Sequence, residues 1–149
     1  GRKRKWVTRE ILTRGLQEKV FCIGRHPVED MPVFFALADV MLVSLKQDPV
    51  FDLTVPGKVQ SYLACGTLVA GMLDGEGARV INESGAGFAG SAGDPAQLVT
   101  CLRRLYHCSV QERSQMRQAS RAYYEMHFER GRQLALLETY LIAAAGQRP

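Results

Sequence analysis

The distribution of apolar residues predicts a chain in which short buried strands alternate with helices. Four apolar runs are short enough for buried strands and span residues 20–23, 40–45, 68–72 and 87–90. The run at 40–45 is apolar nearly throughout, which indicates a parallel strand covered on both faces. Strands and helices in this order predict an α/β domain with a doubly wound parallel sheet.

Helices are predicted between the first strands, and several of their ends carry a start or stop signal. Residues 2–14 place apolar side chains on one face and basic side chains on the other, and Gly15 fits a left-handed C-terminal cap. Residues 28–38 form the next predicted helix. A third begins with Thr54 as the expected N-cap and Pro56 in its first turn.

The second half of the chain is predicted to be mainly helical. A helix through residues 78–81 ends at Gly85, and Asp94 is the natural N-cap of the next one, with Pro95 as its first residue. From residue 96 the helical pattern continues with breaks near Ser109 and 128–131, so residues 110–145 form the terminal helices. Three apolar stripes support this: Leu98, Leu102 and Leu105; Met116, Ala119 and Tyr123; Leu134, Leu137 and Leu141.

The charge pattern points to a basic first helix. The net charge of +4 is modest, and 46% of residues are hydrophobic, which supports a globular core. A basic cluster could contact nucleic acid or anionic lipid, but a solvated helix face is the simpler interpretation. No nucleic-acid-binding motif accompanies it, so we expect no nucleic-acid partner, while peripheral membrane contact stays open. The cluster consists of Arg2, Lys3, Arg4 and Lys5, followed by Arg9 and Arg14.

Cysteine and histidine spacing gives no sign of a metal or disulfide framework. The cysteines, at positions 22, 65, 101 and 108, lack Cys-x-x-Cys spacing, and we expect Cys22 and Cys65 to be small core residues. His107 and His127 have no partner at a metal-ligand spacing. With no signal peptide and no apolar stretch of about 20 residues, a reducing cytoplasmic setting is expected, at most at the inner face of a membrane.

Residues 52–66 are the stretch most suited to binding a ligand. They lie between two predicted strands, so the loop falls on the rim formed by strand carboxyl ends, where doubly wound sheets bind ligands. Gly57 allows close approach to the backbone, and the amino end of the helix with Lys58 beside it suits a phosphate or diphosphate. A plain helix start is the alternative interpretation.

Two further loops are expected on the same rim. The loop at 24–27 contains Arg25, His26 and Pro27, which are binding residues or ordinary surface residues. The loop at 74–79 contains Glu76 and Arg79, which can form a surface ion pair of little energetic value. No Ser-His-Asp arrangement, Walker lysine loop or Gly-x-Gly-x-x-Gly fingerprint occurs, and no catalytic residue can be assigned.

These loops together resemble a known family. The chain is similar to the C-terminal, donor-binding half of family 4 glycosyltransferases of the GT-B type, and most of all to the WbuB-like branch of bacterial cell-surface polysaccharide synthesis. The matching segments are residues 24–27, 38–39, 53–66, 74–79, 85–87 and 93–95. The resemblance implies a Rossmann-like domain that binds a nucleotide-sugar donor, which we expect to be a UDP-sugar. It also implies retention of anomeric configuration, no required metal and no other cofactor.

The resemblance also implies roles for particular residues. Arg25, His26 and Pro27 would border the base. The diphosphate and sugar would be contacted by Leu53, Thr54, Val55 and Pro56, with Gly57 and Lys58 beside them. Ser61 and Gln60 would approach the ribose. The wider family carries two glutamates eight positions apart, whereas this chain has Leu53 and Ser61 at the matching positions.

The first residues also suggest a piece of a longer domain. A doubly wound sheet rarely opens with a basic helix, so we expect residues 1–149 to be part of a C-terminal nucleotide-sugar-binding domain. The acceptor, a sugar or lipid-linked glycan, would be bound by an N-terminal domain, and the isolated chain would transfer no sugar. An exposed sheet edge would favour self-association. A GT-B-type sugar-nucleotide epimerase and a non-catalytic interaction module remain alternatives.

Overall fold

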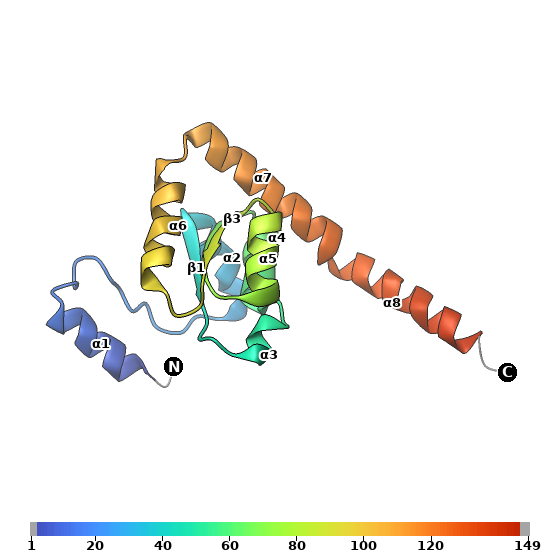
Figure 1. Cartoon of the computed structure of the whole chain (residues 1–149), viewed down its shortest axis with the longest axis horizontal. Coiled ribbons are helices and arrows are strands. Elements are labelled where there is room, and N and C mark those ends of the chain that lie inside the picture. Colours follow the sequence, from blue (N-terminus) through green and yellow to red (C-terminus); the bar gives the residue numbers. More distant parts are fainter. Residues whose placement is uncertain (1–2, 147–149) are drawn as a thin grey trace. The chain divides into compact units, whose positions relative to one another are not determined.

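The computed structural model describes residues 3–146, so Arg2 of the basic cluster lies outside the described residues. The chain forms two units, Gly1–Met31 and Pro32–Pro149, which are described separately. In the second unit, a parallel sheet carries helices on both faces (Figure 1). The predicted α/β class with a doubly wound sheet and a helical C-terminal part is therefore confirmed.

The first unit contains one regular helix, α1 (Arg4–Thr13). Gly15 ends it with φ +64°, and the amide of Leu16 donates to the carbonyl of Ile11 at 2.9 Å. These two features are those of a Schellman motif, so the predicted glycine cap is confirmed. The helix leaves Trp6 half exposed, and none of its residues is buried.

The predicted strand at 20–23 is wrong. These residues have no regular secondary structure, and Phe21 and Ile23 are 70% and 63% exposed. A strand needs a neighbouring backbone for its hydrogen bonds, and an apolar run alone cannot supply one. The chain then passes through a short 3₁₀ helix, η1 (Val28–Asp30), into α2 (Met31–Leu37), close to the predicted helix at 28–38.

The sheet of the second unit has three parallel strands in the order β1–β2–β3. They span Val40–Ser44, Leu68–Met72 and Gly87–Gly90. In register, Leu42 lies opposite Ala70, and Ala70 lies opposite Phe88. Parallel strands joined by helices bring the carboxyl ends of all three strands to one edge of the sheet.

The helices between and after the strands agree with the predicted order, with one addition. A short helix, α3, precedes α4 and was not predicted. The remaining helices follow the strands as expected, with breaks at Ser109 and near Phe128. Their bounds are α3 (Pro49–Asp52), α4 (Gly57–Ala64), α5 (Gly75–Glu83), α6 (Pro95–His107), α7 (Val110–His127) and α8 (Arg130–Ala145).

Two apolar layers enclose β2. On one face, Leu68 and Ala70 pack with Cys101 and Leu105 of α6, which confirms the first predicted stripe. On the other face, Gly71 lies so close to Leu73 and Ile81 that a Cβ would be 2.5 Å and 2.9 Å from their methyl carbons. Burial on both faces explains why β2 is apolar throughout.

Other burial predictions were wrong. Leu42 of β1 is 52% exposed, so this strand is not covered on both faces in the described residues. Cys22 and Cys65 are exposed, and Cys101 is the buried cysteine. The third stripe lies on helix α8, as its helical spacing predicts, and its Leu134, Leu137 and Leu141 are each more than half accessible.

Helix α7 is hydrogen-bonded to the residues that precede β1 and β2. Its Ser120 hydroxyl donates to the carbonyl of Thr67, just before β2, at 3.3 Å. Its Arg117 guanidinium donates to the carbonyl of Ala38, just before β1, at 3.3 Å. These bonds satisfy carbonyls that the sheet does not use. Because α7 contacts the amino ends of β1 and β2, the edge formed by the carboxyl ends of the strands is covered only by the loops that follow them.

Candidate functional site

The loops at the carboxyl ends of the strands form the candidate site. The loop after β1 spans residues 45–56 and contains the short helix α3. The loop after β2 consists of Leu73 and Asp74, and the loop after β3 spans residues 91–94. Asp74 joins two of these loops, because its Oδ1 accepts the amide of Ala92 at 3.2 Å. The predicted rim is therefore present in the second unit.

Most helices of this unit begin with a side-chain cap. The Asp94 carboxylate accepts the amides of Ala96 and Gln97 at 2.9 Å and 3.0 Å, as the Asp94–Pro95 signal predicts. The backbone amide and the side chain of Gln97 lower the pKa of Asp94. Asp48, Ser109 and Glu129 cap α3, α7 and α8 in the same way. Amide groups that face a cap are not available to a ligand.

Helix α4 begins without such a cap. Its N-cap residue is Pro56, which has no side-chain acceptor, and the amide of Val59 donates to the carbonyl of Pro56 at 2.9 Å. Within residues 3–146, the amides of Gly57 and Lys58 have no hydrogen-bond acceptor. These two donors and the positive end of the helix dipole point toward the loop side.

The predicted role of Thr54 as N-cap is wrong. Its hydroxyl donates to the carbonyls of Val50 and Phe51, each at 3.3 Å, at the end of α3. No amide of α4 donates to this hydroxyl, so α4 has no side-chain cap. The position of Pro56 also shifts by one, since it is the N-cap and Gly57 is the first helical residue.

Helix α3 was missed although its signal is present in the sequence. Asp48 is followed by Pro49, and the Asp48 carboxylate accepts the amide of Val50 at 3.1 Å. Hydrogen bonding to Lys46, followed by the Val50 amide, lowers the pKa of Asp48. The same Asp-Pro pair correctly marked the start of α6 at Asp94, so it would have marked this helix too.

Two glycines in the first turn of α5, Gly75 and Gly77, allow the loop after β1 to pack closely against this helix. At Gly75 (φ +63°) a Cβ would lie 2.0 Å from the carbonyl oxygen of Asp52. At Gly77 it would lie 2.9 Å from Cδ of Pro56. The first turn of α5 is therefore covered by the loop. At Gly57 a Cβ would meet nothing within 4 Å, so the start of α4 is open.

The outward face of α4 groups three of the predicted site residues. Gly57, Lys58 and Ser61 are exposed, whereas Val59, Tyr62 and Leu63 are buried. Lys58 makes no ion pair with any residue that the structure describes. The Ser61 hydroxyl donates to the carbonyl of Gly57 at 3.0 Å. Two open amides and a lysine on one face can bind phosphate oxygens.

The remaining predicted residues lie in three different settings. Leu53 is 81% exposed, while Val55, Pro56 and Gln60 are half-buried beside the same helix start. Arg25, His26 and Pro27 belong to the first unit, where Nε2 of His26 lies 3.0 Å from the carbonyl oxygen of Ile23. Their predicted contact with a base stays a prediction.

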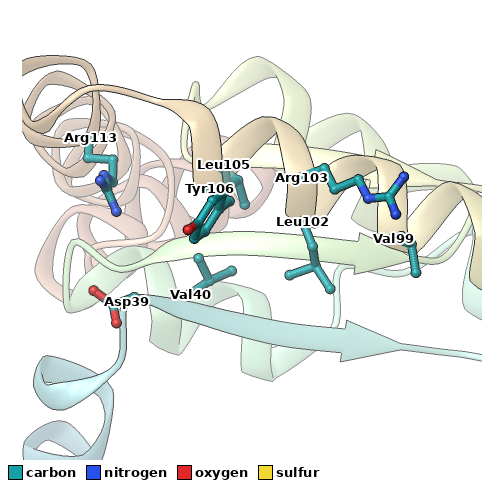
Figure 2. A pocket seen from close by; sticks show the side chains of 8 residues that line it. All are labelled: Asp39, Val40, Val99, Leu102, Arg103, Leu105, Tyr106 and Arg113. Carbon is teal, nitrogen blue, oxygen red and sulfur yellow. The ribbon is translucent and has the colours of Figure 1, made fainter.

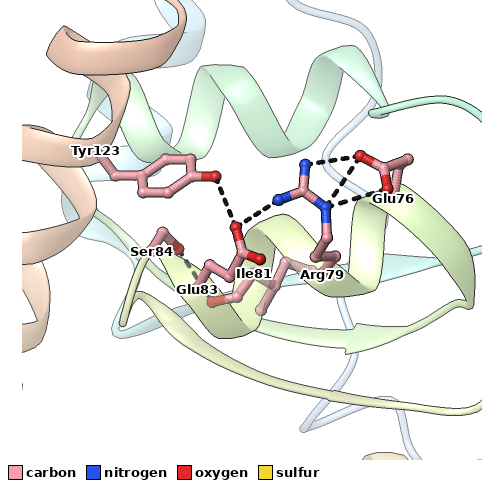
Figure 3. A network of polar contacts seen from close by, with 6 residues as sticks. All are labelled: Glu76, Arg79, Ile81, Glu83, Ser84 and Tyr123. Atoms are coloured by element: carbon pink, nitrogen blue, oxygen red, sulfur yellow. Dashed lines mark hydrogen bonds and ion pairs between the residues drawn. The ribbon is translucent and has the colours of Figure 1, made fainter.

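In the predicted rim segment 74–79, Glu76 and Arg79 belong to a network of ion pairs and hydrogen bonds (Figure 3). Arg79 donates to Glu76 at 2.7 Å and to Glu83, and the Tyr123 hydroxyl lies 3.4 Å from Glu83. The Arg79 hydrogen bond lowers the pKa of Glu76. The structural interpretation of this pair is confirmed, and the network links α5 to α7.

A cation site has no support in the part of the chain between residues 3 and 146. No group of three or more histidine, cysteine, aspartate or glutamate side chains there could hold a metal ion.

No helix in this part is long and apolar enough to cross a membrane. The polar groups beside the start of α4 are the amides of Gly57 and Lys58, the Lys58 side chain and the Ser61 hydroxyl.

The chain matches a known protein family. The family model described as "Glycosyl transferases group 1" matches residues 1–108, which is more than half of the chain. The match includes the loop at 24–27, all of the sheet, the start of α4 and α6. No curated protein matched the sequence.

Proposed function

From the premise that this chain belongs to the group 1 glycosyltransferases, we propose that the start of α4 binds the diphosphate of a nucleotide-sugar donor. Membership in the family implies glycosyl transfer and substrates of two kinds, a nucleotide-sugar donor and an acceptor. The observation that carries the proposal is the uncapped helix start, where the amides of Gly57 and Lys58 are open and Lys58 is exposed.

The proposed mechanism follows from where charge develops. As the sugar leaves the donor, negative charge accumulates on the diphosphate. Fixed amide donors and the Lys58 ammonium stabilise that charge without reorganisation. The donor phosphate helps to deprotonate the acceptor in this proposal, so no protein nucleophile and no metal ion are required. The transfer would then retain the anomeric configuration.

The finer assignments extend this proposal along α4 and its loop. Leu53, Thr54, Val55 and Pro56 would present the sugar and diphosphate contacts, and Ser61 with Gln60 would approach the ribose. This is supported by the exposure of Leu53 and Ser61. Arg25, His26 and Pro27 would border a uracil base.

The biological setting is proposed from the resemblance to the WbuB-like branch of the family. The donor is a UDP-sugar of the hexose or N-acetylhexosamine type, and the product belongs to a bacterial cell-surface polysaccharide such as lipopolysaccharide. The acceptor is a sugar or lipid-linked glycan held by a separate N-terminal domain. The enzyme works in the cytoplasm, at the inner face of the membrane, where the exposed basic residues of α1 favour peripheral contact with anionic lipid.

A calorimetric titration tests donor binding by the chain. UDP, a UDP-hexose and UDP-N-acetylhexosamines are compared with uridine and with inorganic diphosphate. We expect UDP to bind more tightly than uridine, because only UDP brings negative charge to the amides of Gly57 and Lys58. Equal affinity for UDP and uridine would contradict a diphosphate site.

Two variants separate the lysine from the amides. Lys58→Met removes the ammonium and Lys58→Arg keeps a positive charge, whereas the backbone amide remains in both. We expect weaker UDP binding for Lys58→Met and near-normal binding for Lys58→Arg, with the difference reduced at high salt. If both variants bind as the unchanged protein does, Lys58 has no role in the site.

A further inference from the structure

The two faces of the sheet differ in how closely they are packed. On the face toward α6, a pocket of about 430 Å³ lies between β1 and α6, where Val40 faces Leu102 and Tyr106 (Figure 2). On the face toward α5, Gly71 has neighbours so close that a Cβ would lie 2.5 Å from Cδ2 of Leu73. A methyl group added on the α5 side must therefore displace its neighbours, because a close-packed interior has little spare volume.

Gly77 lies on the α5 side, against the start of α4. It is buried in the first turn of α5, and its backbone angle φ is not in the left-handed region. Alanine is the better helix former at such a position, so helix propensity does not explain the glycine. Packing does explain it, because a Cβ would lie 2.5 Å from Cδ1 of Leu73 and 2.9 Å from Cδ of Pro56.

The two neighbours of Gly77 differ in how they can respond to a methyl group. Cδ1 of Leu73 is the end of a side chain, which can change its rotamer. Cδ of Pro56 is bonded to the backbone nitrogen, so the ring cannot move away without moving the main chain. Carbon atoms pack at about 3.5–4.0 Å, so relief of the contact at 2.9 Å needs a backbone shift of roughly 1 Å.

Pro56 is also the N-cap residue of α4. It directly precedes Gly57 and Lys58, whose amides are the proposed donors to the diphosphate. The ring fixes φ at −59°, and the carbonyl of Pro56 accepts the amide of Val59 at 2.9 Å, so Pro56 is joined rigidly to the first turn of the helix. A displacement of Pro56 therefore displaces the two open amides.

We propose that Gly77 is a positioning residue for the donor diphosphate, a role that depends on the proposed function of the start of α4. Its missing side chain lets Pro56 lie directly on α5, and this contact fixes the direction of the two open amides. Gly75 supports the same arrangement, because it brings the first turn of α5 against Asp52 at the other end of the segment. Donors that are held in place in this way bind a phosphate without reorganisation.

Two double variants test this role on a shared background with extra space. Leu73→Val shortens the side chain that lies close to both Gly71 and Gly77. In Leu73→Val/Gly77→Ala, Pro56 is then the neighbour that must move. Leu73→Val/Gly71→Ala is the matched control, because it adds the same methyl group where the remaining close neighbours belong to α5 and β3.

Calorimetric titration with UDP and with uridine compares the full 149-residue chain with Leu73→Val and the two double variants. We expect Leu73→Val/Gly77→Ala to bind UDP roughly 3- to 10-fold more weakly than Leu73→Val, with uridine binding unchanged, because only the phosphate contacts lose their geometry. The Gly71→Ala control should bind UDP as Leu73→Val does. In ¹⁵N spectra without ligand, the amide signals of Gly57 and Lys58 should shift only in the Gly77→Ala variant.

A third variant tests whether the effect passes through the proline ring. Pro56→Ala is added to Leu73→Val/Gly77→Ala, and the result is compared with Leu73→Val/Pro56→Ala. Without the ring the methyl group has room, so Gly77→Ala should change UDP affinity by less than about twofold on this background. An equal loss of affinity with and without the ring would overturn the proposed role.

A purely structural role for Gly77 predicts a different pattern. UDP affinity would then follow the free energy of unfolding, measured in urea, and both double variants would lose affinity in proportion to their loss of stability. That result overturns the proposal, as does a folded Leu73→Val/Gly77→Ala protein that binds UDP as tightly as Leu73→Val. If the unchanged chain binds UDP no more tightly than uridine, the proposed function fails, and the role of Gly77 fails with it.

Discussion

Replacing Gly57 by alanine separates binding from stability at the proposed phosphate site. A Cβ at this position would meet nothing within 4 Å, and the backbone angle φ there is not in the left-handed region. The fold therefore accepts the methyl group without strain. In a helix, the Cα–Cβ bond tilts toward the amino end, which is where a phosphate would approach the open amides.

Gly57→Ala is expected to keep or increase the stability of the fold but to weaken the binding of UDP. Glycine is less favourable than alanine in a helix by roughly 0.5–1 kcal/mol, so Gly57→Ala should leave the free energy of unfolding unchanged or raise it by up to about 1 kcal/mol. A phosphate held away from one amide loses a hydrogen bond to a charged group, worth about 1.5–3 kcal/mol. The Kd for UDP should then rise roughly 10- to 100-fold.

Urea unfolding and calorimetric titration of the same sample measure both quantities. Gly131→Ala is the matched control, because Gly131 is in the first turn of α8 and its Cβ would meet only the flexible carboxylate of Glu129, at 3.2 Å. It should leave UDP binding unchanged. If Gly57→Ala is stable and its Kd for UDP stays within about twofold, the phosphate does not lie at this helix start.

Three further predictions address the loop, the lysine and the cap. Gly75→Ala should lose about 2–5 kcal/mol in urea unfolding, because φ is +63° and the Cβ would overlap Asp52; an unchanged midpoint would contradict this packing. Lys58→Met should raise the Kd for UDP roughly fivefold at low salt, and the effect should fade in high salt; an effect equal at both salt concentrations would argue against charge. Bonding to Gln97 lowers the pKa of Asp94, so its ionised form stabilises the fold above about pH 4 and this contribution disappears as the pH falls. Asp94→Asn should flatten the loss of unfolding free energy below about pH 4, and an unaltered pH profile would refute that role.

Much of the second unit could be predicted from local signals. The apolar runs at 68–72 and 87–90 correspond to β2 and β3 with the same bounds. Gly85 has the left-handed conformation expected of a helix-ending glycine, and Asp94 caps α6. These signals succeed because each depends on the residue itself and on its immediate neighbours.

Features that depend on distant partners could not be predicted in this way. The run at 20–23 has the composition of a strand, but a strand forms only beside another backbone. Cys65 lies in an apolar segment yet points outward, because α4 buries Tyr62 and Leu63 instead. Leu42 looks like a core residue and remains half exposed.

The open start of α4 was predicted correctly, whereas its capping residue was not. The start of the helix after β1 was expected to be an open amino end, and Gly57 with Lys58 provides it. Thr54 was assigned as the cap because threonine is a common N-cap, but its hydroxyl has two nearer carbonyls at the end of α3. That competition arises from α3, so the assignment failed once the Asp48–Pro49 signal was missed.

The central claim, that the start of α4 holds the donor diphosphate, is tested most directly by heteronuclear NMR. The amide signals of the ¹⁵N-labelled chain are followed while UDP is added. The account predicts the largest shifts at the amides of Gly57 and Lys58, with smaller shifts through residues 53–61 and at 25–26. Shifts confined to residues outside 24–28 and 52–62 would contradict it.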